Sequence, residues 1–105
     1  MAAPMAIFQV PFQDWWTGEC VPQNDNPTQI ICAIPLEHTG TIDAIIVQAK
    51  HANQDIIYVG NSANQFFELA PGETVTLPVN NINNVYIRRT AGSDGDGVNY
   101  IAGVF

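Results

Sequence analysis

The feature that most constrains the fold is a series of short β-rich runs that continues from Thr28 to the C-terminus. Gly, Pro and Asn, the residues that favour turns, separate these runs. The expected strands lie within Thr28–Ile34, Thr41–Ala49, Ile56–Val59, Phe66–Leu69, Glu73–Val79, Val85–Arg89 and Val98–Val104. No stretch shows the helical spacing of apolar residues over a useful length. The pattern predicts an all-β fold with a single β-sandwich, of which a jelly roll is one form, although it does not define the order of the strands.

The run Val85–Arg89 shows how such a segment divides between core and surface. Successive side chains of a strand point to opposite faces of the sheet. Val85 and Ile87 therefore point inward, and Tyr86 and Arg88 point outward. The alternation predicts a half-buried strand.

The first segment, residues 1–27, differs from the rest because it contains four of the seven prolines and a group of aromatic residues. Proline at this density disfavours regular strand pairing. We therefore expect two parts, an extended N-terminal arm over 1–27, with one short strand around Ile7–Val10, and a sandwich domain over 28–105. Trp15 and Trp16 are adjacent, so one is expected to pack inward, and the other needs a different cover or stays exposed.

The composition favours a binding protein over an enzyme with several domains. A chain of 105 residues has the size of one domain with one core. Hydrophobic residues make up 47% of the chain and charged residues only 12%. Much of the surface must then consist of Asn, Gln, Thr and Ser. Such a surface suits a protein that is covered by a partner, but an ordinary monomeric β-domain has a similar composition.

The charge balance argues against two classes of partner. The net charge is −7, and the basic residues are Lys50, Arg88 and Arg89. Nucleic acid and anionic membranes both require a basic surface, so we expect neither as a ligand. The N-terminus lacks the features of a secretory signal, and we expect synthesis in a host cytoplasm. Cys20 and Cys32 are either free thiols or one disulfide bridge.

Catalytic groups are scarce, and we expect no enzyme activity. The two histidines, His38 and His51, accompany no recognisable nucleophile motif. The loop Ser93–Gly97 carries Asp94 and Asp96, which are weak candidates for binding a hard cation such as Ca²⁺. The same loop is also typical of a Gly-rich hairpin turn. We therefore predict no cofactor and no firm metal site.

Arg88 and Arg89 are adjacent on an expected strand, which places one guanidinium on each face. In a chain this acidic, at least one of them should meet carboxylates or an aromatic plane. The first possibility is a local ion pair with Asp94 or Asp96. The second is a salt bridge to another subunit.

Three segments of the second half resemble small phage virion proteins, including capsid decoration or cement proteins. These segments are Ile57–Ser62, Leu69–Leu77 and Asn84–Ile87, and the resemblance covers residue 56 to the end. It implies an all-β module that trimerises or sits at capsid symmetry axes and clamps neighbouring shell subunits. The implied partner is a capsid shell protein, and the implied location is the virion. The Pro-rich N-terminal half does not follow the resemblance.

A cement protein adds interface to a shell by means of edge strands, arms and aromatic anchors. The candidate interface residues are Phe8, Phe12, Trp15, Trp16, Tyr86, Arg88 and Arg89. The alternative function is a carbohydrate- or receptor-binding module of a phage tail or head fibre. Its stacking platform would be formed by Trp15, Trp16 and Tyr58.

Overall fold

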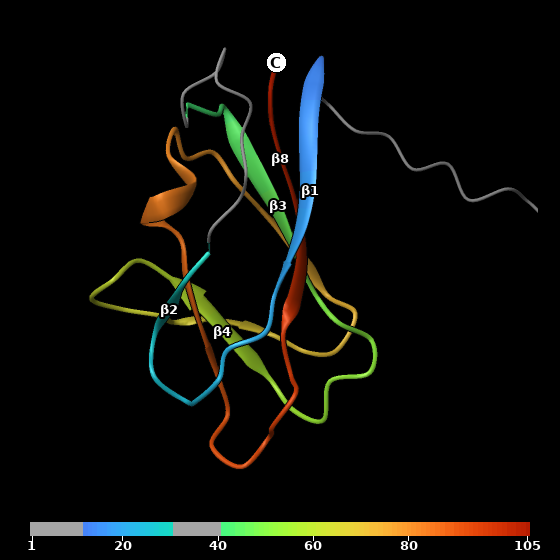
Figure 1. Ribbon diagram of the computed structural model, residues 1–105, viewed down its shortest axis with the longest axis vertical. Helices are drawn as coiled ribbons and strands as arrows, with labels where there is room; N and C mark the ends of the chain where they lie inside the picture. The colour runs from blue at the N-terminus through green and yellow to red at the C-terminus, as the bar shows by residue number, and fades with distance from the viewer. Residues whose placement is uncertain (1–11, 31–40) are drawn as a thin grey trace, which may run out of the picture.

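The computed structural model describes residues 12–30 and 41–105, and it confirms the predicted β-sandwich. Two antiparallel sheets of four strands form the domain (Figure 1). The strands are β1 (Asp14–Cys20), β2 (Thr28–Gln29), β3 (Ala44–Ala49), β4 (Ile57–Gly60), β5 (Phe67–Leu69), β6 (Thr74–Leu77), β7 (Tyr86–Arg89) and β8 (Val98–Val104). A single 3₁₀ turn, η1 (Ile82–Asn84), precedes β7. In the described part of the chain, no helix is long and apolar enough to cross a membrane.

The order of the strands identifies the sandwich as a jelly roll. Sheet A has the order β1-β8-β3-β6, and sheet B has the order β2-β7-β4-β5. The first strand pairs with the eighth, the second with the seventh, the third with the sixth and the fourth with the fifth. The chain is therefore one long antiparallel ribbon that is rolled into two sheets, which is the double Greek-key arrangement.

The core lies between the two sheets because the strands alternate as the sequence predicts. On β8, Val98, Tyr100 and Ala102 are buried, whereas Asn99 faces outward. The same alternation holds on β7, where the inward position of Ile87 is confirmed. The core cluster is made mainly of β-branched residues: Ile30, Ile42, Ile45, Val47, Ile57, Val59, Ile82, Val85, Ile87 and Val98, with Ala49, Leu69, Tyr100 and Ala102.

The predicted boundary of the N-terminal arm is wrong for part of its length. Asp14–Cys20 is not an arm but β1, which pairs with β8 along its whole length. The prolines did not exclude a strand here, because Pro22 follows β1 after a one-residue interval and none lies inside it. The sandwich therefore includes β1, and it does not begin at residue 28. The predicted short strand Ile7–Val10 lies outside the described residues.

The turn between β5 and β6 is built as the Pro-Gly dipeptide predicts. Gly72 has a φ of 86°, in the left-handed region that favours glycine. The N–H of Glu73 donates to the carbonyl oxygen of Ala70 at 2.9 Å. The Glu73 carboxylate accepts in return from the N–H of Ala70 at 2.7 Å. The turn delivers the chain from sheet B to sheet A.

Gly18 of β1 has a close packing partner in the core. It lies opposite Tyr100 of β8, and a Cβ at position 18 would lie 2.3 Å from the Tyr100 hydroxyl oxygen. Tyr100 is itself buried, so its ring has little room to move away. The missing side chain of Gly18 thus provides the space for the tyrosine ring.

We expect Gly18→Ala to lower the free energy of unfolding by about 1–3 kcal/mol, because the added methyl group overpacks the site against Tyr100. Urea unfolding followed by circular dichroism measures the change. The control is Thr17→Ala, since Thr17 is the exposed neighbour on the same strand. Equal stabilities of the Gly18→Ala variant and the wild type would contradict the packing described for Tyr100.

Candidate protein-docking surface

The outer face of sheet B carries a row of three side chains across three neighbouring strands. Glu68 of β5 lies beside Tyr58 of β4, and Tyr58 lies beside Arg88 of β7. The guanidinium carbon of Arg88 is 4.3 Å from the centroid of the Tyr58 ring. This is a cation–π contact, and it holds the Arg88 guanidinium over the Tyr58 ring. Tyr86 lies on the same side of β7, two residues away.

β5 forms one edge of sheet B and exposes two phenylalanines. Phe66 directly precedes β5 and is 79% exposed, and Phe67 is 62% exposed. Phe66 lies two residues from Glu68 and therefore shares its outward side, while Phe67 points the other way. Among residues 12–30 and 41–105, β4 is the one strand that pairs with β5, and both rings are largely exposed.

An edge strand also presents N–H and C=O groups that no neighbouring strand uses. Proteins protect such an edge by keeping the strand very short, or with charged side chains, especially Lys, with Pro or with a bulge. β5, with the sequence Phe-Glu-Leu, is short and carries one charged residue, Glu68, but it contains neither Lys nor Pro. We call the outward-facing Tyr58, Phe66, Tyr86 and Arg88, together with Phe67 on the other side of the same edge, the β5 docking surface. Aromatic residues and arginine are the types that dominate binding energy at protein interfaces.

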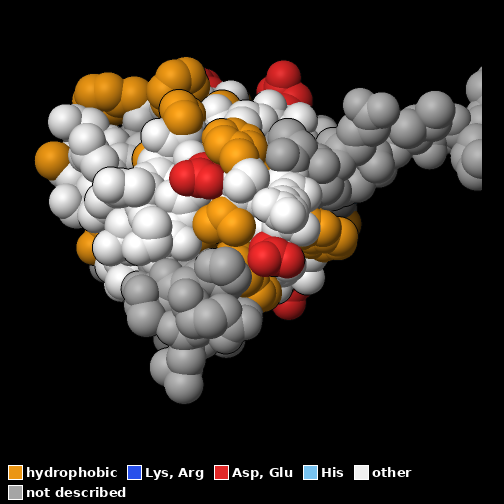
Figure 2. All heavy atoms as spheres, turned by 90° about the horizontal axis from the view of Figure 1, so that it is seen from above, with side chains coloured by type: hydrophobic (Ala, Val, Ile, Leu, Met, Phe, Trp, Pro, Cys, Tyr) orange, Lys and Arg blue, Asp and Glu red, His pale blue; other side chains and the backbone are white. Residues whose placement is uncertain are grey.

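A second aromatic group lies at the end of the sandwich where β1 begins and β8 ends. Phe12 and Phe105 stack with ring centroids 5.6 Å apart. The Phe12 ring covers Gly103, and Trp15 is paired with Gly103 across the strands. Figure 2 looks onto this end of the molecule and shows hydrophobic and acidic side chains, with no Lys or Arg in view.

The structure separates the two tryptophans as predicted. Trp16 packs against the core cluster, and Trp15 is 47% exposed on the outer face of sheet A. Tyr58 lies on the outer face of the other sheet, under Arg88. Trp15, Trp16 and Tyr58 therefore share no face, and the predicted stacking platform for a sugar is wrong.

The other predicted interface residues take different places. Tyr86 and Arg88 point outward and belong to the β5 docking surface. Phe12 is buried and has its partner in Phe105. Phe8 lies outside the described residues. Phe66 and Phe67 were missed, although the argument applied to Trp15 and Trp16 also holds for two adjacent phenylalanines on a strand.

Arg89 is buried and forms the local ion pair that the sequence predicts. It is 6% exposed, and its Nη2 lies 2.9 Å from a carboxylate oxygen of Asp94. The guanidinium also donates to the carbonyl oxygens of Gln23 and Thr90, at 3.4 Å each. Arg89 thus connects β7 to two loops, and little of it is available to a partner.

The second carboxylate of the 93–97 loop also has a local role. Asp96 is 2% exposed, and its two oxygens accept from the backbone N–H groups of Gln54 and Asp55, at 2.8 and 3.0 Å. Asn53 and Gly97 join the same two loops by a reciprocal pair of hydrogen bonds. Asp94 and Asp96 are thus directed at protein groups, and among residues 12–30 and 41–105 no cluster of three or more His, Cys, Asp or Glu could hold a metal ion.

The remaining reactive groups lie apart from one another. His51 is exposed, with its ring over Gly72 of the β5–β6 turn. Cys20 is a free thiol at the end of β1, and its partial burial raises its pKa. A raised pKa keeps the thiol protonated and lowers its reactivity as a nucleophile. His38 and Cys32 lie outside the described residues.

The comparisons with known proteins gave no match: no family model matches the chain, and no curated protein or solved structure is significantly similar to it. The fold and the surfaces described above therefore carry the functional argument.

The two neighbouring arginines should respond differently to charge reversal. Arg89→Glu would place a second carboxylate in a buried site beside Asp94, and we expect a loss of about 3–5 kcal/mol of stability. Arg88→Glu removes only the contact with Tyr58, and a loss of about 0.5–1 kcal/mol is expected. Thermal and urea unfolding of both variants measure the difference. Equal losses would show that the environments of the two guanidinium groups are alike.

The role of Asp96 predicts a structural effect that calcium does not change. Asp96→Ala leaves two backbone N–H groups without their charged acceptor, and we expect a loss of about 2–3 kcal/mol. Asp25→Ala, at an exposed position, is the control and should be close to neutral. Addition of Ca²⁺ or EDTA should leave the Tm of the wild type unchanged. A Tm that rises with Ca²⁺ would instead assign the loop to a cation.

Proposed function

We propose that this protein is a structural virion protein, a decoration or cement protein that binds a phage capsid as an oligomer, and that the β5 docking surface provides one of its contacts. The observation that carries the proposal is the exposure of Phe66 and Phe67, at 79% and 62%, at the edge strand β5. Two large apolar side chains exposed at one sheet edge give a partner strand apolar contacts on both of its sides.

The hydrophobic gain from covering these two rings is substantial for a small domain. Burying one large apolar side chain contributes roughly 1.5–3 kcal/mol, so the two rings supply about 2–4 kcal/mol when they are largely covered. Further hydrogen bonds become available if a partner strand pairs with the free edge of β5. Arg88, held against Tyr58, adds a donor for a carboxylate or carbonyl oxygen of the partner.

The jelly-roll fold supports this proposal without being sufficient for it. Viral capsid domains use this fold, but lectins and cupins use it as well. The low content of charged residues is a second support, because such a surface is suited to being covered by other protein chains.

A trimer requires two different contact surfaces on each copy, because a closed ring of three uses heterologous contacts. The β5 docking surface is one of them. The second is the aromatic end, with Trp15 and Phe105 both exposed. In this arrangement, β5 of one copy meets the aromatic end of the next copy, and the faces of the ring stay available to shell subunits.

We expect the double variant Phe66→Ser, Phe67→Ser to fold normally and to lose association. Sedimentation of the wild type should give the mass of a trimer, and that of the variant the mass of a monomer. Co-pelleting with purified phage particles should fall at least tenfold. Val21→Ser is the control, since Val21 is also exposed and lies outside the β5 docking surface. A wild-type monomer that does not bind particles would refute the proposed function.

A further inference from the structure

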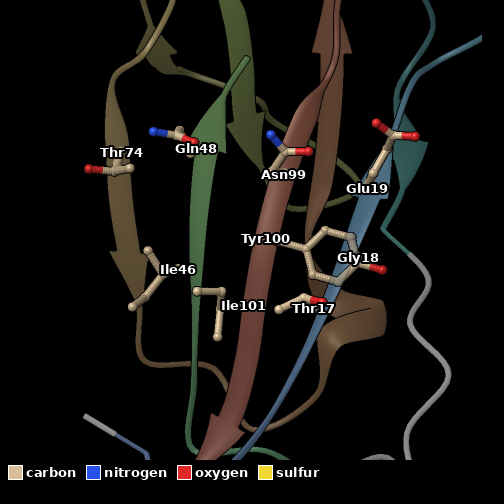
Figure 3. Close-up of a pocket in the computed structure, with 9 residues that line it drawn as sticks. All are labelled: Thr17, Gly18, Glu19, Ile46, Gln48, Thr74, Asn99, Tyr100 and Ile101. Atoms are coloured by element: carbon tan, nitrogen blue, oxygen red, sulfur yellow. The ribbon is translucent and has the colours of Figure 1, made fainter. Parts of the chain in front are cut away.

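We propose that the outer face of sheet A binds a neutral oligosaccharide in a groove that crosses all four strands of the sheet. The groove has a volume of about 440 Å³, within the range of small-molecule sites. Figure 3 shows the lining side chains, which come from β1, β8, β3 and β6. This site is distinct from the predicted platform of Trp15, Trp16 and Tyr58, and it lies on the other sheet from the β5 docking surface.

Strand register places four polar side chains in one row across the groove. Glu19 pairs with Asn99, Asn99 with Gln48, and Gln48 with Thr74. Adjacent strands are about 4.8 Å apart, so the row spans about 14 Å from end to end. That length offers hydrogen-bonding groups to more than one unit of an extended chain of sugars.

The next row on the same face provides an apolar surface. Ile101 pairs with Ile46, and Thr17 lies beside Ile101 on β1. Both isoleucines are partly exposed and line the groove. A sugar ring has an apolar C–H face and a polar rim of hydroxyl groups. The isoleucine row can contact the apolar face of the sugar ring, and the polar row can form hydrogen bonds with its hydroxyl groups.

The charges of the groove select against an ionic ligand. Glu19 is the one charged residue among those that line it, and its carboxylate is paired with Lys50. The groove is therefore close to neutral, although the chain as a whole carries −7. It offers neither a basic group for an anion nor an unpaired carboxylate for a cation.

The amides of Gln48 and Asn99 are available to a ligand. Within the described part of the chain, neither side chain makes a hydrogen bond to another protein group. Each amide supplies a carbonyl acceptor and an NH₂ donor. A sugar hydroxyl also donates and accepts, so one such group can satisfy both functions of an amide. A second copy of the chain fits less well, because the side chains that line the groove include no exposed aromatic residue that could anchor a protein partner.

Titration of the ¹⁵N-labelled protein with cellohexaose, maltohexaose, mannohexaose and hexa-N-acetylchitohexaose tests the proposal. We expect at least one of these neutral probes to shift the amide signals of residues 17–19, 46–48 and 99–101. Gln48→Ala and Asn99→Ala should each weaken binding of that probe at least tenfold. Gln54→Ala, which removes an exposed glutamine of a loop, is the matched control and should leave the affinity unchanged.

Three results would overturn the inference. The first is that none of the four probes shifts the signals of the groove. The second is that hexagalacturonate, an anionic probe, binds as well as the neutral ones. The third is that the same signals shift with protein concentration alone, since this would identify a second copy as the occupant. The Phe66→Ser, Phe67→Ser variant should keep its sugar binding, so failure of the proposed assembly role would be seen separately.

Discussion

The antiparallel pairing of β1 with β8 is the interaction on which the other features depend. It joins the first strand to the last, and because β8 also pairs with β3, it places β8 in the interior of sheet A. The inner side of this pairing contributes Tyr100 to the core, over Gly18. The outer side brings Glu19 next to Asn99. The core and the groove thus lie on the two faces of the same pair of strands.

The two sheets differ in the chemistry of their outer faces. Sheet B exposes phenylalanine, tyrosine and an arginine, with the phenylalanines at its edge strand β5. The groove of sheet A exposes amide and hydroxyl groups around two isoleucines, and the exposed Trp15 is not among the residues that line it. Aromatic and guanidinium groups favour a protein partner, whereas neutral amides in a hollow favour a small polar ligand. A particle protein that contacts its neighbours through the β5 docking surface and the aromatic end leaves the groove of sheet A available for a ligand.

The three basic residues do not form a surface of their own. Lys50 is paired with Glu19, Arg89 with Asp94, and Arg88 lies on Tyr58. The buried Arg89 guanidinium and the buried Asp96 carboxylate fix the positions of the turns, because each forms hydrogen bonds with polar groups of another loop. Asp96 does this for the backbone at Gln54 and Asp55. The loop residues that are most suggestive of metal binding in the sequence are therefore structural.

The sequence by itself determined what depends on neighbouring residues. The alternation of residue types set the inward and outward sides of Val85–Arg89. The adjacency of Trp15 and Trp16 required one of them to point away from the core. The dipeptide Pro71-Gly72 defined a turn. Only the tertiary structure decided that Asp14–Cys20 is a strand, because its partner β8 is about 80 residues away in the chain and the nearby prolines favoured an arm. The same holds for the exposure of Phe66 and Phe67 and for the polar row of sheet A. Whether a side chain is exposed, and which side chains form a row across a sheet, depends on which strands become neighbours and which become edges. The pairing of strands that are distant in the sequence decides this, and no local pattern does.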